Sequence, residues 1–169
     1  LVMAIVTESR IWIANIGDSR AYHIGDDWVE QVTVDHTAVQ DAIDRGLYTM
    51  DELQNKTSLR QMDSSLLRNL GFGGNPQADI FTMDFQPGHI VMLCSDGVSG
   101  SLAKPLLSAD PIFRHINGTP TIKAAAEHLV RLALQNGSTD NMSVVLIEIG
   151  KRKRKGPKIA APPTVEKTL

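Results

Sequence analysis

The stretch Ile90–Gly100, which reads I-V-M-L-C-S-D-G-V-S-G, decides the fold that we expect for this chain. Its apolar first part is too short to cross a bilayer and is typical of a fully buried β-strand. The strand ends abruptly at Ser95-Asp96-Gly97. An aspartate at that position places a carboxylate at the rim of a sheet, where a hard cation or a polar substrate can reach it. The alternative is that Asp96-Gly97 forms an ordinary turn.

Two more aspartates stand next to strand-like segments that are far away in the sequence. Asp18 lies within Gly17-Asp18-Ser19-Arg20, and Asp140 is followed by Asn141. Carboxylate oxygens suit Mg²⁺ and Mn²⁺, whereas the chain has neither a Cys-x-x-Cys nor a His-x-x-x-His pair, so we expect no zinc site. The alternative for Asp18 is a turn residue that caps Arg20. The three aspartates are therefore candidate ligands of a divalent cation.

Four short segments carry a resemblance to a known family. They are A-N-I-G-D-S-R-A-Y at 14–22, V-T-V-D-H-T at 32–37, L-C-S-D-G-V at 93–98 and G-S-T-D-N-M-S-V-V at 137–145. Their order and spacing resemble the C-terminal two-thirds of the catalytic domain of the PP2C-like (PPM) family of metal-dependent protein serine/threonine phosphatases. The resemblance covers nearly all of residues 1–150. It implies an α+β fold, the PP2C-like αββα sandwich of two antiparallel sheets flanked by helices.

The resemblance also implies roles for single residues. Asp96 and Asp140 match the two C-terminal aspartates that hold a pair of metal ions, and Asp18 matches the aspartate that binds a third ion. The main-chain oxygen of Ser64 is a further expected ligand, from the flap beside the metal centre. The expected cofactor is Mg²⁺ or Mn²⁺, with two or three ions in the complete domain. The upstream metal motif of the family has no counterpart here, so we expect the sandwich to be incomplete at its N-terminal side.

The function that the resemblance implies is metal-dependent hydrolysis of phosphoserine and phosphothreonine in proteins by a metal-activated water. The implied partners are a phosphorylated protein substrate and a cognate Ser/Thr kinase. The absent upstream motif leaves open whether this chain is active alone. The alternative is a non-catalytic pseudophosphatase module that binds a phosphoprotein or a kinase. The presence of both Asp96 and Asp140 favours the enzyme, because a binding module has no use for both.

Composition restricts the class of protein. The 169 residues include 42% hydrophobic and 21% charged residues, which indicates one soluble globular domain rather than a disordered chain. A formal net charge of −2 gives no basic field for specific nucleic-acid binding. The chain has no apolar run of transmembrane length and no signal-peptide pattern, and its single cysteine, Cys94, excludes a disulfide framework. We therefore expect a cytoplasmic protein.

The histidines give no candidate for catalysis. None of the five matches the upstream histidine that is the proposed general acid of the family. We expect His36 to cap a helix. We expect the other four at turns or on helix surfaces, at positions His23, His89, His115 and His128.

Local patterns predict the individual elements. Alternating and β-branched residues predict a meander of antiparallel strands over 1–6, 11–16, 21–24 and 28–34. Further strands are predicted over 80–85, 90–94 and 142–149. Capping residues and apolar periodicity predict helices over 38–45, 50–54, 98–107 and 121–135.

A change of composition divides the chain into two parts. Residues 1–150 form the predicted partial phosphatase domain, and residues 151–169 form a basic, Pro/Ala-rich tail or linker that we expect to be disordered. The tail begins with the run K-R-K-R-K at Lys151–Lys155. Its alternative role is attachment to nucleic acid or to an anionic membrane surface.

Overall fold

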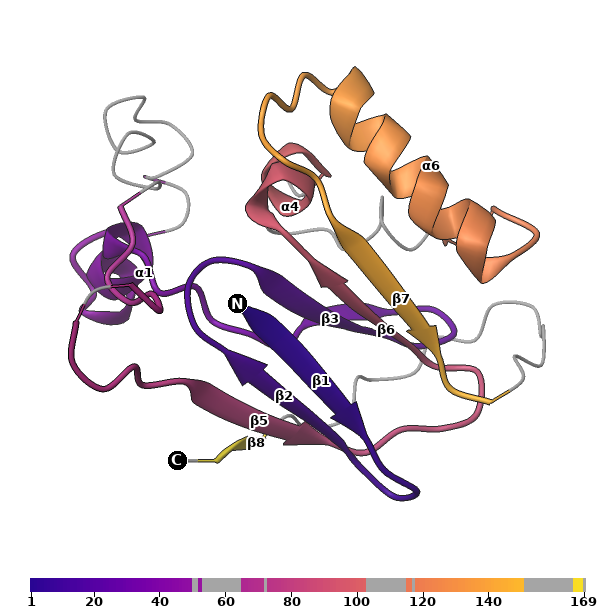
Figure 1. Ribbon diagram of the computed structural model, residues 1–169, viewed down its shortest axis with the longest axis horizontal. Helices are drawn as coiled ribbons and strands as arrows, with labels where there is room; N and C mark the ends of the chain where they lie inside the picture. Colours follow the sequence, from indigo (N-terminus) through magenta and orange to yellow (C-terminus); the bar gives the residue numbers. More distant parts are fainter. Residues whose placement is uncertain are drawn as a thin grey trace.

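The computed structural model describes residues 1–49, 52, 65–71, 73–102, 115–116, 118–150 and 166–168. Within these residues the chain forms two four-stranded antiparallel sheets (Figure 1). Sheet A has the strand order β1 (Val2–Val6), β2 (Ile11–Asn15), β5 (Asp79–Met83) and β8 (Glu166–Thr168). Sheet B has the order β4 (Val29–Gln31), β3 (Arg20–Ile24), β6 (Ile90–Cys94) and β7 (Val144–Glu148). The helices are α1 (Ala38–Asp44), α4 (Asp96–Leu102) and α6 (Ile122–Gln135).

Strand β6 is buried on both of its faces, as its continuous apolar run predicts. Val91 belongs to the core between the two sheets. Ile90, Met92 and Cys94 belong to a second core, between sheet B and the helices. The side chains of a strand alternate between its two faces, so a strand that lies between two cores needs apolar residues at every position.

The two cores have different partners. The core between the sheets is made by Ile11, Ile13, Ala21, Val32, Phe81, Met83, Val91 and Ile149. The core under the helices is made by Tyr22, Ile24, Ile90, Met92, Cys94, Val98, Leu102, Ile116, Ala125, Leu129 and Ala133. Sheet B therefore lies in the middle of the molecule and contributes to both cores.

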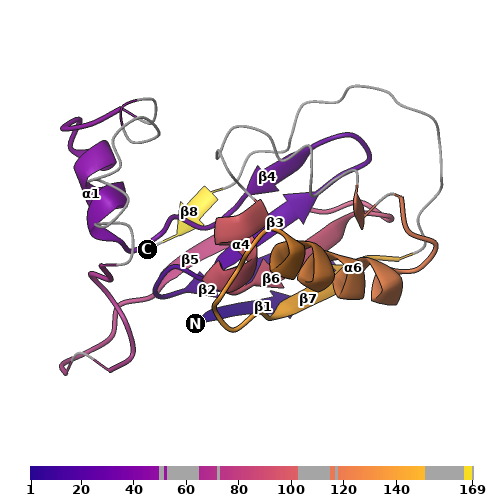
Figure 2. The same cartoon turned by 90° about the horizontal axis from the view of Figure 1, so that it is seen from above.

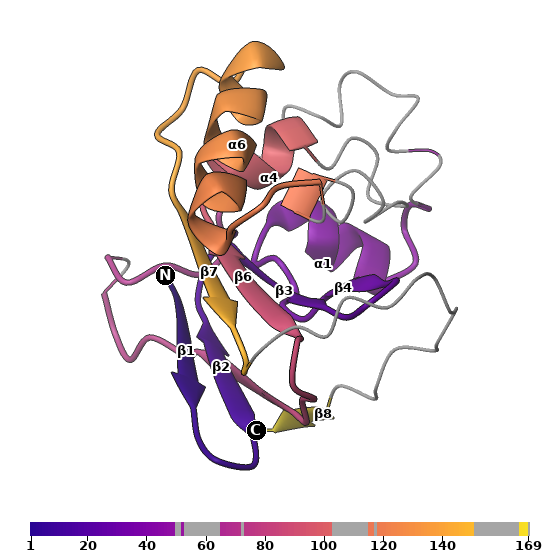
Figure 3. The same cartoon turned by 90° about the vertical axis from the view of Figure 1, so that its right-hand side faces the viewer.

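Helices α4 and α6 pack on the outer face of sheet B (Figure 3). Helix α1 lies at one end of the sandwich (Figure 2). In the ranges that the structure describes, no helix lies on the outer face of sheet A, where Met3, Ile5 and Trp12 are 47%, 52% and 39% exposed. The predicted two antiparallel sheets with helices are confirmed, and the described helical layer covers sheet B.

The chain passes from one sheet to the other between β2 and β3. The prediction of a single meander through the first four strands is wrong at this point, because β2 pairs with β1 and β5 while β3 pairs with β4 and β6. Gly17 stands at the crossing with φ +102°, a backbone conformation that residues with a Cβ rarely adopt. The crossing places Asp18 at the junction of the two sheets.

Strand β4 is shorter than the predicted 28–34. After Gln31 the ladder changes, because Val32 N donates to Ala21 O at 2.8 Å while Ala21 N donates to the side-chain oxygen of Thr33 at 3.0 Å. A hydroxyl thus replaces a main-chain carbonyl as the acceptor. The regular pairing of the strand ends there.

Helices α1 and α6 begin at the predicted caps. Thr37 Oγ1 accepts from Gln40 N at 3.2 Å, and Thr121 Oγ1 accepts from Ala124 N at 3.1 Å. The predicted Thr49–Glu52 capping box is also present, since Thr49 N donates to Glu52 Oε2 at 2.9 Å. The remainder of the predicted helix 50–54 lies outside the described residues.

Helix α4 begins two residues earlier than predicted, at Asp96. Ser95 O accepts from Val98 N at 3.0 Å and from Ser99 N at 3.2 Å, so the helix starts directly where β6 ends. The predicted continuation from 103 to 107 lies outside the described residues.

The C-terminal region differs from the predicted disordered tail at three residues. Residues 166–168 form β8, which pairs with β5 in the register Ile80↔Thr168 to Thr82↔Glu166. Strand addition needs only main-chain hydrogen bonds, which polar composition does not prevent. Lys151–Lys155 and the rest of 151–165 lie outside the described residues, so the division at residue 150 stays a prediction.

No helix in the described ranges has the length and apolarity needed to cross a membrane.

Candidate metal-binding site

Asp96 stands at the rim of sheet B, where β6 becomes α4. Its Oδ1 accepts from Gly97 N at 3.0 Å, and its side chain is exposed while the next three residues are buried. The abrupt change from buried strand to helix therefore leaves one carboxylate at the surface, as the sequence predicts.

Asp140 stands in the connection from α6 to β7 and is also exposed. Its Oδ1 accepts from Asn141 N at 2.7 Å. This connection passes beside the start of α4 (Figure 1). The antiparallel pairing of β6 with β7, which joins Cys94 to Val144, brings the two segments to the same edge of sheet B.

Ser95 ties the two aspartate segments together. Its Oγ donates to Asn141 O at 3.0 Å and accepts from Ser143 N at 3.0 Å, and its own N–H donates to Ser143 O at 3.1 Å. Ser138 adds a bond from its Oγ to Gly97 O at 2.6 Å. Four hydrogen bonds thus fix the position of Asp96 relative to Asp140, and sequence reasoning missed both serines.

Gly97 allows this close approach. A Cβ at this position would lie 2.5 Å from Asn141 O, a main-chain atom that cannot rotate away. The Asp-Gly pair is therefore more than a turn, because the glycine is where the two segments touch.

The two aspartates line one pocket of about 210 Å³. Its other walls come from the start of α4 and from the segment that follows α6. The full lining is Asp96, Gly97, Gly100, Ser101, Asn136, Gly137, Ser138, Thr139 and Asp140.

Asp18 lies close enough to Asp96 for the two charges to interact. Burial raises the pKa of the Asp18 carboxyl, and the carboxylate of Asp96 raises it further, with a smaller contribution from Asp35. Asp18 does not cap Arg20, because Arg20 forms a bidentate pair with Asp35, with Nη2 at 2.6 Å from Oδ2. Asp18 is therefore placed beside the pocket, although it does not line it.

The carboxylates fit a hard divalent cation. Within the part of the chain that the structure describes, Asp18, Asp96 and Asp140 form no ion pair with a Lys, Arg or His side chain. Carboxylates that converge without a cationic side chain are suited to Mg²⁺ or Mn²⁺. No group of three or more His, Cys, Asp or Glu side chains suited to a metal forms among the described residues. Ser64 lies outside the described residues.

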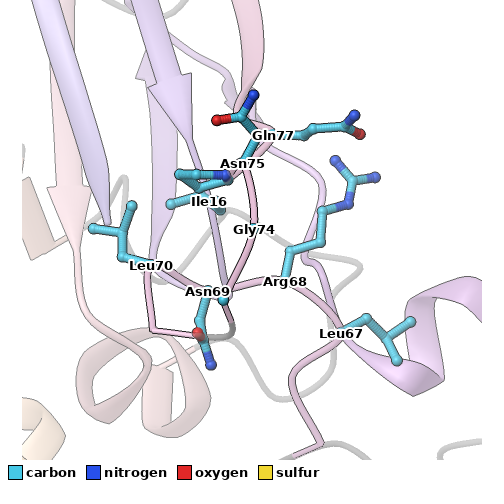
Figure 4. Close-up of a pocket in the computed structure, with 10 residues that line it drawn as sticks. Ile16, Leu67, Arg68, Asn69, Leu70, Gly74, Asn75 and Gln77 are labelled. Carbon is cyan, nitrogen blue, oxygen red and sulfur yellow. The ribbon is translucent and has the colours of Figure 1, made fainter.

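A second pocket is lined by Ile16 (Figure 4), which directly precedes Gly17–Ser19, the loop that carries Asp18 and is called the Asp18 loop below. It has a volume of about 190 Å³, and Ile16, the residue after β2, faces the segment that carries Arg68. Arg68 Nη1 donates to Asp79 Oδ1 at 2.9 Å. The remaining lining residues are Leu67, Asn69, Leu70, Gly73, Gly74, Asn75, Pro76 and Gln77.

Two histidines, His23 and His36, differ from their predicted positions. His23 is 0% exposed, lies on β3 and pairs through Nε2 with His89 Nδ1 at 2.9 Å. His36 is buried and does not cap α1, because Thr37 is the N-cap. A histidine on a strand has the same alternation as its apolar neighbours, and sequence reasoning gave that pattern too little weight.

The relatives found by sequence and those found by structure are both serine/threonine phosphatases, although no protein-family model matches the sequence. The chain is 32% identical over 148 residues to the serine/threonine phosphatase stp of Listeria innocua, covering 88% of this chain and 55% of the relative. A crystal structure of the serine/threonine phosphatase PstP/Ppp from Mycobacterium tuberculosis superposes with a TM-score of 0.76 and 28% identity, covering 88% of this chain and 59% of that one. The chain has the fold of the PP2C-like (PPM) phosphatases, and its sequence is similar to theirs over 88% of its length.

A further solved structure, which contains metal ions, confirms the PP2C-like fold of the chain. The catalytic domain of PstP in complex with two manganese ions has a TM-score of 0.68 and 27% identity, covering 89% of this chain and 58% of that chain. The chain spans about half the length of the curated Listeria relatives that it matches, 55% in each case.

Proposed function

We propose that this PP2C-like chain is part of a metal-dependent phosphatase that hydrolyses phosphoserine and phosphothreonine in proteins. The observation that carries the proposal is the junction of β6–α4 with the α6–β7 connection. There Ser95 and Gly97 hold Asp96 and Asp140 at one pocket. The names of the relatives and the manganese complex of a structural neighbour support the same chemistry.

The proposed ligands of the metal pair are Asp96 and Asp140, and the proposed ligand of a third ion is Asp18. The main-chain oxygen of Ser64 is proposed as a further ligand. The proposed cofactor is Mg²⁺ or Mn²⁺, with two or three ions in the complete domain. A bound divalent ion would lower the pKa of a water molecule and neutralise charge on the phosphoryl oxygens.

The residues of the chain itself supply the geometry. Ser95 and Ser138 fix the spacing of the two carboxylates, and Gly97 allows the two segments to lie this close. The Asp18 carboxyl stands nearby in a half-buried position, where a cation would offset its repulsion with Asp96. A phosphorylated protein is the proposed substrate, a cognate Ser/Thr kinase is the proposed partner, and a cytoplasmic location remains a prediction of the sequence.

The test is Mn²⁺-dependent hydrolysis of a phosphothreonine peptide. It is run on the 169-residue chain and on a longer chain that includes what its gene encodes on either side, up to the length of the curated relatives. We expect activity in the longer chain, and a loss of at least about a hundredfold in Asp96→Asn and in Asp140→Asn, since each removes a charged metal ligand. Asp26→Asn, in the exposed turn between β3 and β4, is the matched control and should leave the activity unchanged.

Two results would contradict the proposal. Equal activity in Asp96→Asn and in Asp26→Asn would show that the proposed ligands are not used. A folded longer chain that binds Mn²⁺ but hydrolyses no phosphopeptide would leave the alternative, a module that binds a phosphoprotein or a kinase.

A further inference from the structure

His36 holds both main-chain polar groups of the residue that precedes Asp18. Gly17 N donates to His36 Nδ1 at 3.1 Å, and His36 N donates to Gly17 O at 3.1 Å. Asn15 Nδ2 also donates to Gly17 O, at 3.3 Å. His36 is 5% exposed, so water does not compete for these bonds. The N–H of Gly17 is therefore held by the ring of His36, and its C=O by the main chain of His36 and the side chain of Asn15.

The same histidine reaches the segment that lines the second pocket. His36 Nε2 lies 3.4 Å from Asp79 Oδ2, and Asp79 Oδ1 accepts from Arg68 Nη1 at 2.9 Å. His36 O accepts from Leu67 N at 2.8 Å. Leu67 and Arg68 both line the pocket of Figure 4. His36 thus stands between the Asp18 loop on one side and this pocket wall on the other.

The two ring nitrogens have different tasks. Nδ1 accepts from a backbone N–H, so it carries no proton, and the proton of the neutral ring is on Nε2. That Nε2–H faces the carboxylate of Asp79. Each nitrogen can therefore be replaced separately by the amide of a different side chain.

The Asp18 loop needs such an anchor. Gly17 has φ +102°, a conformation that glycine adopts without strain but does not enforce, because glycine has many others available. The carboxyl of Asp18 is half-buried beside the like charge of Asp96, which favours movement of the loop away from the pocket. Fixing Gly17 at both its N–H and its C=O resists that movement.

We infer that His36 is a positioning residue: through Nδ1 it fixes Gly17 and hence Asp18, while its Nε2 faces Asp79. The part of this inference that concerns metal rests on the proposed function. The part that concerns the loop rests on the contacts of His36 alone.

Three substitutions separate the two ring nitrogens. His36→Asn keeps a polar atom near the position of Nδ1, His36→Gln keeps one near the position of Nε2, and His36→Ala keeps neither. Mn²⁺ binding to the 169-residue chain is measured by the electron paramagnetic resonance of free Mn²⁺, and the relevant site is the one that Asp18→Asn removes. We expect the affinity of this site to fall about 10- to 100-fold in His36→Gln and His36→Ala, and to stay near that of the wild type in His36→Asn.

Amide hydrogen exchange of Gly17 gives a readout that needs no metal. We expect the Gly17 N–H to stay protected in the wild type and in His36→Asn, and to exchange faster in His36→Gln and His36→Ala. His128→Asn, on helix α6, is the matched control and should change neither measurement. If His36→Ala does not fold, the comparison of Asn with Gln carries the test.

Two outcomes would overturn the inference. One is an equal effect of Asn and Gln on Gly17 exchange and Mn²⁺ binding, in proportion to their loss of thermal stability, which would make His36 a structural residue only. The other is no effect of any variant on Gly17. If Asp18→Asn leaves Mn²⁺ binding unchanged, the metal assignment of Asp18 has failed, and the exchange pattern alone decides the role of His36.

Discussion

Gly97 is the residue at which the two halves of the candidate site meet. Its main chain lies so close to Asn141 that a Cβ would stand 2.5 Å from the carbonyl oxygen. The same helix contains Gly100, where a Cβ would meet nothing within 4 Å. These two glycines, three positions apart in α4, therefore form a matched pair for substitution.

We expect Gly97→Ala to lower the free energy of unfolding by about 1–3 kcal/mol, because the new methyl group overpacks against main-chain atoms. It should also weaken Mn²⁺ binding, since the Asp140 segment must move. Gly100→Ala should be neutral or stabilising by about 0.5–1 kcal/mol, because alanine favours the helix. Urea unfolding and Mn²⁺ titration of the two variants test this, and equal stability of both would contradict it.

His23 makes stability depend on pH. Burial, with a smaller contribution from neighbouring His89, lowers the pKa of His23 to about 4. Its ring also lies 4.8 Å from that of Trp28. The unfolded chain takes up this proton near pH 6.5, whereas the folded chain does so only near pH 4. The unfolded state therefore binds more protons between these values, and stability falls as the pH is lowered.

The expected loss from His23 is about 2 kcal/mol of unfolding free energy between pH 6.5 and pH 5. Urea unfolding at several pH values measures it. His23→Gln should flatten the dependence in this range, while His128→Gln on α6 should leave it as in the wild type. An unchanged slope in His23→Gln would show that another group is responsible.

The sequence predicts the position of a residue well where that position depends on the residues next to it in the chain. Asp96 and Asp140 each stand beside a strand, and the structure brings them to one pocket. Ser95 could not be predicted as the link between them, because its partner Asn141 is 46 positions away. His36 was missed for the same reason, since its contacts with Gly17 and Asp79 exist only after the sheets have packed.

At the scale of the elements, the sequence predicts strands better than it predicts the sheet to which each belongs. Ile11 and Ile13 on β2 and Ala21 on β3 all point into the core between the sheets. An inward-pointing apolar residue has the same alternation in either sheet, so the pattern cannot show that the chain changes sheets at Gly17. The change is visible only in the pairing of β2 with β5 and of β3 with β6.

The starts of the helices also differ in how well the sequence predicts them. The starts of α1 and α6 are decided by the threonines that cap them, and both could be predicted. The start of α4 was predicted two residues late, because Asp96-Gly97 has the composition of a turn. Main-chain bonds to Ser95 O, from Val98 and Ser99, override that composition.

At the scale of the whole molecule, the two outer faces of the sandwich differ. Sheet B is covered by α4 and α6, whereas Met3, Ile5 and Trp12 on sheet A are exposed in the described part of the chain. Apolar side chains that gather on one face form a surface to which small apolar dyes bind.

We expect the 169-residue chain to bind the dye ANS through this face of sheet A. The double substitution Ile5→Thr and Trp12→Thr should reduce the dye fluorescence severalfold, because it removes the centre of the apolar surface while threonine still suits a strand. Leu134→Thr, an exposed leucine on α6, is the control and should have little effect. The same fluorescence in the double variant and in the control would contradict the expectation.

The bond between Ser95 and Asn141, 46 residues apart, also has a consequence for the synthesis of the protein. When β6 leaves the ribosome, the segment that will become β7 has not yet been made. Until β7 emerges, the edge of Ile90–Cys94 that it will cover is open, and this is the most continuously apolar strand of sheet B. During that interval the nascent chain carries a strand edge that is prone to aggregation.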